Sequence, residues 1–180
     1  MKNSKIIALS AVSAAFAVVL LALGSFIEII DIACVMFAGV AIMIPLSKDS
    51  IWGALLAYLT SAVLGFILGG ARFTVIVPYV AFFGIYPIAN ALQIKYKINR
   101  FLALVIKDVW FLGAMFLYYK MLVIFSGYDL FADFSMIPEN FRNFIVPALI
   151  VFGAIFFVLY DSVMLKMQLA VNYIVNKLKL

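Results

Sequence analysis

The chain has 180 residues, of which 68% are apolar and 12% are charged, with a formal net charge of +5 and no histidine. Soluble domains are about 45–50% apolar and about 25% charged, so this composition excludes an ordinary soluble fold and indicates an integral membrane protein. The single cysteine, Cys34, excludes an intramolecular disulfide, and the usual zinc and haem ligand sets are missing.

Six apolar segments have lengths close to that of a membrane-spanning helix. They lie at about 6–27, 32–46, 50–69, 73–94, 101–125 and 143–165, with short polar joints and one longer loop between them. The second is the shortest, because a straight helix over 32–46 rises only about 22 Å, whereas the hydrocarbon core is about 30 Å thick. A membrane barrel would need alternating polar and apolar residues, and runs such as 14–23 are apolar throughout. The sequence therefore predicts one all-α membrane domain over 1–180.

The positions of the basic residues predict how these segments cross the membrane. Lysine and arginine favour the cytoplasmic side, so the positive charge reports orientation and does not indicate nucleic-acid binding. With six spans, the outer joints carry only Arg72 and Arg142. The inner side then carries nine basic residues: Lys2, Lys5, Lys48, Lys95, Lys97, Arg100, Lys166, Lys177 and Lys179. Without a crossing at 32–46 most of them would lie outside, so we predict six spans with both termini in the cytoplasm.

The first segment, 6–27, follows Lys2 and Lys5 and ends in small residues, as cleaved signal peptides do. Its apolar run is longer than a signal's core and further spans follow, so we expect it to remain as a span. Small residues recur near one face of this segment, at Ala8, Ala11, Ala15 and Ala22. The step from Ala11 to Ala15 lets another helix approach closely, which favours either docking of a partner or packing within the same bundle.

Charged residues fall at the predicted outer joints, where a solute from outside would bind. Glu28 and Asp31 lie between the first two spans, and Arg72 follows three glycines between the third and fourth. Glycine lets backbone approach a ligand, and a guanidinium can clamp a carboxylate or a phosphate. The alternative is a solvent-facing turn whose arginine reaches towards lipid headgroups. No Gly-Lys-Ser/Thr closes the glycine-rich stretch, so it is not a nucleotide-binding loop.

Tyr118, Tyr119 and Lys120 lie shortly before the outer end of the fifth span. They could grip an aromatic or anionic solute, or they could form an aromatic belt with a lysine that reaches for headgroups. The loop that follows, 126–142, is long and polar enough to act as a lid. The candidate solute-binding residues are therefore Glu28, Asp31, Arg72, Tyr119, Lys120 and Arg142.

Prolines inside the predicted spans indicate interruptions of regular helix. Pro78 and Pro87 lie in the fourth span and Pro147 lies in the sixth. Proline removes a backbone donor, so we expect kinks at these positions, shielded by neighbouring helices or polar side chains.

Four polar residues lie inside the spans towards the cytoplasm: Asn90, Lys107, Asp108 and Asp161. Such groups are costly in a membrane unless they are paired or face water. A proton relay is one interpretation; the interpretation we favour is structural, with one Lys–Asp pair neutralising most of the cost. No nucleophile, base and orienting residue stand in a recognisable arrangement, so we do not expect an enzyme, and no cofactor is predicted.

The six-span plan, together with Ala11-Val-Ser-Ala-Ala15 in the first span and the stretch from Ser50 to Gly70 in the third, resembles the substrate-binding S components of energy-coupling factor transporters. The stretch from Tyr79 to Asn90 is similar to a segment of uncharacterised six-span bacterial membrane proteins. The resemblance implies a bacterial plasma-membrane subunit that binds a vitamin or similar micronutrient in its outer half. It also implies a transmembrane coupling subunit, contacted by Ala11 and Ala15, and two cytoplasmic ATPases that supply the energy.

Two alternatives belong to other functional classes. The chain is also similar to the small membrane subunit of the bacterial rod-shape machinery, a scaffold with a stable protein partner and no small ligand. A self-sufficient proton-coupled carrier would need Asp108 and Asp161 beside one water-filled path.

Overall fold

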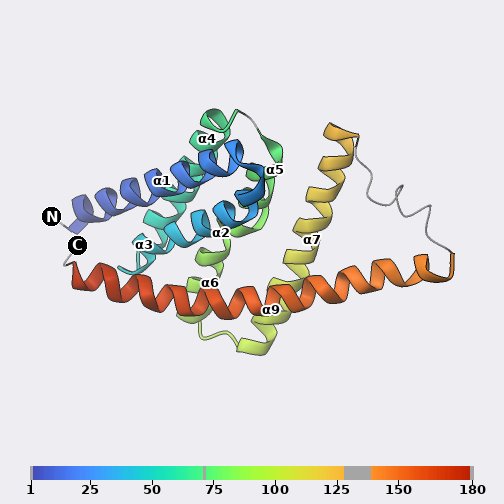
Figure 1. The fold of residues 1–180 in the computed structure, drawn as a ribbon. Helices are drawn as coiled ribbons and strands as arrows, with labels where there is room; N and C mark the ends of the chain where they lie inside the picture. The colour runs from blue at the N-terminus through green and yellow to red at the C-terminus, as the bar shows by residue number, and fades with distance from the viewer. Residues whose placement is uncertain (1, 71, 128–138, 179–180) are drawn as a thin grey trace. The chain divides into compact units, whose positions relative to one another are not determined.

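The computed structural model describes residues 2–70, 72–127 and 139–178 of the protein (Figure 1). These residues form helices and turns, with no strand among them. Six of the helical segments are long and apolar enough to cross a membrane: Ser4–Phe26, Glu28–Leu46, Ile51–Leu68, Phe73–Lys95, Arg100–Phe125 and Phe144–Lys177. The prediction of an all-α, six-span membrane protein is confirmed.

The helices follow the order of the predicted spans. They are α1 (Lys2–Phe26), a 3₁₀ turn η1 (Glu28–Ile30), α2 (Asp31–Ala41), α3 (Met43–Leu46), α4 (Ile51–Leu68), α5 (Phe73–Pro78), a π-helical segment η2 (Tyr79–Phe83), α6 (Tyr86–Lys95), α7 (Arg100–Ser126) and α9 (Glu139–Lys177). They belong to two compact units. Unit 1 comprises Met1–Asn99 and Val163–Leu180, and unit 2 comprises Arg100–Ser162.

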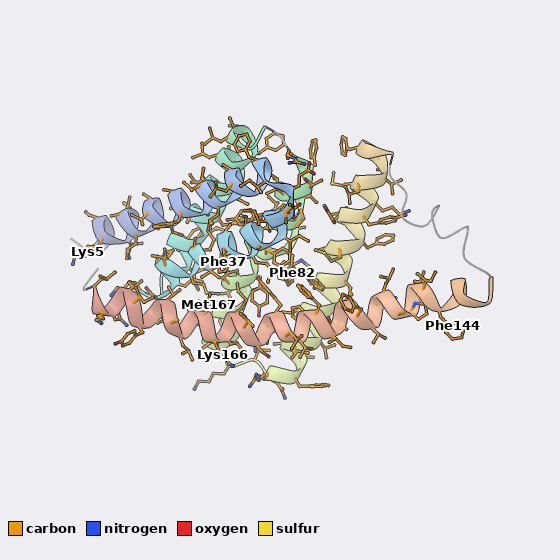
Figure 2. The ribbon with its side chains drawn as sticks, in the orientation of Figure 1. Lys5, Phe37, Phe82, Phe144, Lys166 and Met167 are labelled. Carbon is orange, nitrogen blue, oxygen red and sulfur yellow. The ribbon has the colours of Figure 1, made fainter. Side chains whose placement is uncertain are left out.

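Unit 1 has two ends at which charged residues gather. At one end, Lys5 of α1 lines a groove together with the last residues of α9, and Lys48 donates a hydrogen bond of 3.0 Å to Asn176 of α9. We call this the terminal end, because the beginning of α1 and the end of α9 lie there (Figure 1; Figure 2). At the other end, the joint end, Arg72 pairs with Glu28. The concentration of lysines at the terminal end favours its predicted placement in the cytoplasm.

α1 packs against α2 and α4 in unit 1, and small residues allow the close approach. A Cβ on Gly53 of α4 would lie 2.6 Å from Ser10 Oγ, and one on Gly65 would lie 2.7 Å from a Leu21 methyl carbon. The hydroxyl of Ser13 is fully buried and donates to the Ala41 carbonyl at 2.7 Å. The space beside Gly65 is thus filled by α1 and is not open to a ligand.

The second span is longer than the sequence indicated. Glu28–Leu46 has 19 residues, which corresponds to about 28 Å of helix and nearly matches the hydrocarbon core. The 3₁₀ turn begins at Glu28 and α2 begins at Asp31, so both acidic residues belong to helical structure at the head of this span.

The fourth span departs from regular helix after Pro78, as predicted. α5 ends at Pro78 and the next five residues are π-helical, with the Gly84 amide donating to the Tyr79 carbonyl at 2.8 Å. In an α-helix that amide would bond to the Val80 carbonyl. The Tyr58 hydroxyl donates to Val80 O instead, at 2.9 Å. A side chain of the neighbouring span therefore satisfies the backbone group that the irregularity releases.

The sixth span is the clearest difference from the predicted boundaries. The expected span, 143–165, ends just before Lys166, yet α9 has 39 residues, which corresponds to about 58 Å. It continues through Pro147 and on to Lys177, because residues 154–177 contain no glycine or proline. Its last turns pack in unit 1, where Val175 is buried.

Unit 2 holds α7 against the first part of α9 through aromatic stacking. The ring of Phe111 lies 6.0 Å from that of Phe156 and 5.7 Å from that of Phe157, both stacked. A Cβ on Gly153 would lie 3.0 Å from a Leu112 methyl carbon, so the two helices are in close contact there.

Candidate functional site

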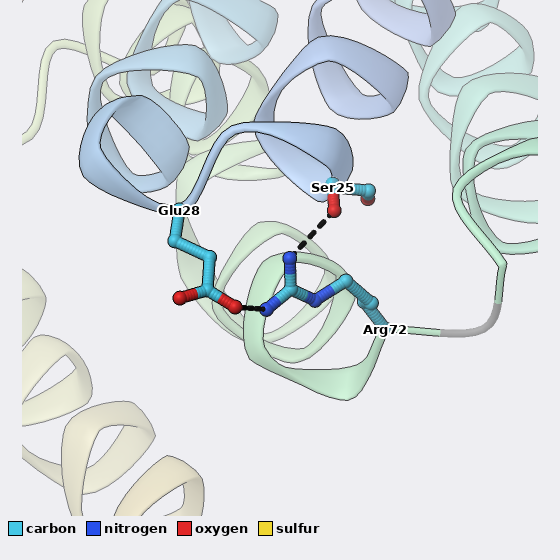
Figure 3. Close-up of polar contacts among 3 residues, drawn as sticks. All are labelled: Ser25, Glu28 and Arg72. Atoms are coloured by element: carbon cyan, nitrogen blue, oxygen red, sulfur yellow. Dashed lines mark hydrogen bonds and ion pairs between the residues drawn. The ribbon is translucent and has the colours of Figure 1, made fainter.

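The joint end of unit 1 brings together Arg72, Glu28 and Ser25 (Figure 3). One guanidinium nitrogen of Arg72 donates to the Ser25 carbonyl at 2.6 Å, and the other terminal nitrogen pairs with Glu28 Oε1 at 2.5 Å. The Arg72 side chain is 35% exposed and that of Glu28 is 76% exposed. The pair therefore lies at the surface of the joint, accessible to a solute.

The end of α1 explains why Arg72 takes this position. The last four carbonyls of a helix have no partner within the helix, and α1 ends at Phe26, so the Ser25 carbonyl needs an outside donor. A cation at a helix carboxyl terminus also interacts favourably with the helix dipole. Arg72 thus caps α1 and ties its joint to the joint before α5. A carboxylate or phosphate ligand would have to displace Glu28 from the guanidinium.

The other predicted solute-binding residues do not all belong to this cluster. The Asp31 carboxylate accepts a hydrogen bond from the Ile32 amide at 2.5 Å and makes no ion pair within 4.0 Å in the described part of the chain. Tyr119 and Lys120 lie on α7 in unit 2, where the ammonium of Lys120 sits 5.5 Å from the centre of the Phe116 ring. Arg142 lies in the first turns of α9, and its side chain is outside the described residues. The proposed lid, 126–142, falls largely outside them too.

The predicted partner-docking residues lie on the outward side of α1. Ala11 and Ala15 are exposed, as is Ala8. The core of unit 1 is built on the other face of the helix, which buries Ser13 and Ala17 completely. Neither Ala11 nor Ala15 contributes to that core, so the small-residue step is available on the surface of unit 1.

An apolar groove of about 530 Å³ lies beside this surface, at the terminal end. It runs between α1 and the last turns of α9. Its lining residues are Lys5, Ala8, Leu9, Val12, Phe16, Ile44, Val171, Ile174, Val175 and Leu178. The exposed face of α1 therefore combines small side chains with a hollow wide enough to admit apolar side chains of another helix.

Unit 2 contains a buried ion pair of the Lys–Asp type predicted from the sequence. Lys107 Nζ lies 2.5 Å from Asp161 Oδ1, and the two side chains are 8% and 4% exposed. The pairing accords with the structural interpretation of the intramembrane charges. Asp108, beside it in sequence, has one carboxylate oxygen buried with no hydrogen-bond partner in the described part of the chain. No group of three or more acidic or cysteine residues that could hold a metal ion occurs among the described residues.

Comparison with known proteins identifies no relative: no family model matches the sequence, and no curated protein or solved structure matches it.

The exposed pair at the joint end predicts a small effect on stability. Replacing Glu28 with glutamine should change the free energy of unfolding by less than about 1 kcal/mol, because exposed ion pairs contribute little. Arg72→Gln should cost more than Glu28→Gln, since it also removes the donor to the Ser25 carbonyl. Thermal unfolding of both variants in detergent checks this order. Equal effects, or a larger one for Glu28→Gln, would contradict the capping role of Arg72.

Proposed function

We propose that this multi-pass membrane protein is the substrate-binding subunit of an uptake transporter of the energy-coupling factor type, in the bacterial plasma membrane. A transmembrane coupling subunit would dock on α1, and two cytoplasmic ATPases would supply the energy. The substrate would be a vitamin or similar micronutrient. The observation that carries the proposal is the outward position of Ala11 and Ala15, on a face of α1 that the core of unit 1 does not use.

Small side chains on an outward face allow another helix to pack closely in a bilayer. Lipid tails are as apolar as leucine, so helices associate in membranes mainly through close packing, and small residues are enriched where they do. Large apolar residues such as Val12 and Phe16 flank the alanines on the same exposed face and leave a shallow seam along it. The adjacent 530 Å³ groove extends this seam towards the terminal end. Together they favour a partner helix over lipid alone.

The joint end would receive the solute. Arg72 and Glu28 offer a cation and an anion at an accessible surface, and exchange of Glu28 for a ligand carboxylate would leave the Ser25 contact in place. Tyr119, Lys120 and Arg142 stay candidates for the same role. The chain has no nucleotide-binding loop in its sequence, which fits a subunit energised by partners.

If a partner helix packs on Ala11 and Ala15 of α1, larger side chains at these positions should block it. The double variant Ala11→Phe, Ala15→Phe should lose its membrane partner while unfolding at the same temperature as the natural protein, because both positions are exposed. Thr60→Phe, at an exposed position of α4, is the matched control and should keep the partner. The measurement is affinity purification from native membranes, followed by identification of copurifying subunits and by assay of ATP hydrolysis.

Three results separate the possibilities. A membrane subunit with ATPases that copurifies with the Thr60→Phe variant but not with the alanine variant supports the proposal. Copurifying shape-determining proteins would favour the scaffold class instead. Equal recovery of the same partner with both variants would show that the α1 face is not the docking surface.

A further inference from the structure

A second cavity, of about 320 Å³, opens at the terminal end of unit 1. Three separate parts of the chain line it: the turn between α3 and α4, the end of α6, and α9 beyond the predicted end of the sixth span. Its polar lining residues are Asp49, Asn90, Lys95, Gln168 and Asn172. A cavity of this volume has room for a small polar molecule.

The cavity carries one charge of each sign. Asp49 and Lys95 both line it and both are exposed to solvent. The ion pairs of the described residues are Arg72 with Glu28 and Lys107 with Asp161, so Asp49 and Lys95 are not within 4.0 Å of each other. Two opposite charges that share a small cavity without pairing leave room for a molecule between them.

The backbone holds the carboxylate in place. Asp49 has a φ of 55°, a left-handed conformation that aspartate tolerates better than most residues. Its amide donates to the Leu46 carbonyl at 3.0 Å, which closes the turn. The neighbouring Lys48 is tied to Asn176 of α9 at 3.0 Å. The turn that presents the Asp49 carboxylate is therefore anchored to the helix on the other side of the cavity.

Amide groups lie on the α9 wall. Gln168 Nε2 donates to Asn172 Oδ1 at 2.8 Å, one helical turn further on. This bond orients both amides and leaves Gln168 Oε1 as an acceptor and the Asn172 amide nitrogen as a donor. Asn90, on α6, is only 2% exposed and lines the inner wall. Donors and acceptors therefore both line the cavity that the two charges share.

We propose that this cavity binds a small zwitterion, with its ammonium group beside Asp49 and its anionic group beside Lys95. The Gln168 and Asn172 amides would bond its neutral polar atoms. A ligand that carries both charges satisfies both side chains, whereas a simple cation or anion satisfies one of them. Two sources offer this chemistry: a free amino-acid-like solute and an ethanolamine phospholipid headgroup. The inference does not rest on the proposed transport function, since it uses a different part of unit 1.

The test uses the full protein in nanodiscs made from phosphatidylglycerol alone, a lipid whose headgroup carries no positive charge. In the first arm, phosphoethanolamine or glycine is added and the thermal unfolding midpoint is titrated to give a dissociation constant. In the second arm, phosphatidylethanolamine is included in the disc and retained lipid is counted by native mass spectrometry. Ethanolamine alone and inorganic phosphate alone are the single-charge probes. Asp49→Asn keeps the left-handed turn accessible, and Lys97→Gln is the matched control for Lys95→Gln, because Lys97 does not line the cavity.

Binding of a zwitterion in either arm, weakened at least about tenfold by Asp49→Asn and by Lys95→Gln but not by Lys97→Gln, is the expected result. Binding only in the first arm identifies a free solute, and retention only of phosphatidylethanolamine identifies the lipid. The proposal is overturned if no zwitterion binds in either arm. It is also overturned if ethanolamine or phosphate alone binds as tightly, or if the two cavity variants bind like the natural protein.

Discussion

Replacing Asp161 with alanine is expected to destabilise unit 2 by about 3–5 kcal/mol, which is the usual cost of removing one partner from a buried ion pair. Asp161 is 4% exposed and lies 2.5 Å from the Lys107 ammonium, which is itself 8% exposed. The substitution removes the carboxylate that this buried ammonium contacts. The general reason for this cost is that a buried charge is poorly compensated once its ion-pair partner is removed.

Thermal unfolding in detergent measures this effect. For a chain of this length, about 3–5 kcal/mol lowers the unfolding midpoint by about 10 °C. Ser162→Ala, at the adjacent exposed position, is the control and should change little. The double variant Lys107→Met, Asp161→Leu removes both charges and should recover most of the loss, because no unpaired charge remains. A double variant as unstable as Asp161→Ala would show that the pair itself holds α7 to α9.

The number and type of the spans could be predicted because a bilayer allows few solutions. Runs of apolar residues must be helical and must approach the thickness of the membrane. The ends of the spans were less predictable. Lys166 suggested a stop for the sixth span, but a lysine does not end a helix, and α9 continues to Lys177. The second span, conversely, begins earlier than its apolar run, because Glu28 and Asp31 are part of its first turns.

Side-chain partners were predictable in kind but not in detail. A Lys–Asp pair inside the spans was expected from the cost of isolated charges, yet the contact of Lys107 with Asp161 depends on how α7 packs against α9, which sequence spacing does not give. Glu28 and Arg72 were correctly assigned to the same end of the molecule. Their direct contact depends on where α1 ends and on the need to cap Ser25, which no spacing in the sequence encodes.

The faces of α1 illustrate a different ambiguity. Small residues occur on two sides of this helix, with Ser10, Ser13 and Ala17 on one side and Ala11 and Ala15 on the other. Periodicity alone could not decide which side packs into the bundle, because both satisfy the requirement for close approach. The glycines of α4 resolve it, since Gly53 leaves space for Ser10. The cavity of about 320 Å³ could not be predicted from the sequence for a similar reason, because its residues come from three distant segments of the chain.

The second large effect is expected at Gly39 of α2, where alanine should destabilise unit 1 by about 1–3 kcal/mol. A Cβ at this position would lie 2.5 Å from the Phe83 carbonyl oxygen. That oxygen belongs to the backbone of the π-helical segment, and Phe83 is itself buried, so it cannot rotate away as a side chain would. The substitution should force α2 and the irregular part of the fourth span apart.

Gly113→Ala in α7 is the matched control, because a Cβ there would meet nothing within 4 Å. Glycine inside a helix is less favourable than alanine by about 1 kcal/mol, so this variant should be as stable as the natural protein or slightly more stable. The same gain in helix propensity applies at Gly39 and partly offsets the clash with Phe83 O. A loss of stability in Gly39→Ala would therefore be a lower bound on the cost of that clash. If Gly39→Ala raised the unfolding midpoint as Gly113→Ala does, α2 and the π-helical segment would not be in the close contact on which the core of unit 1 depends.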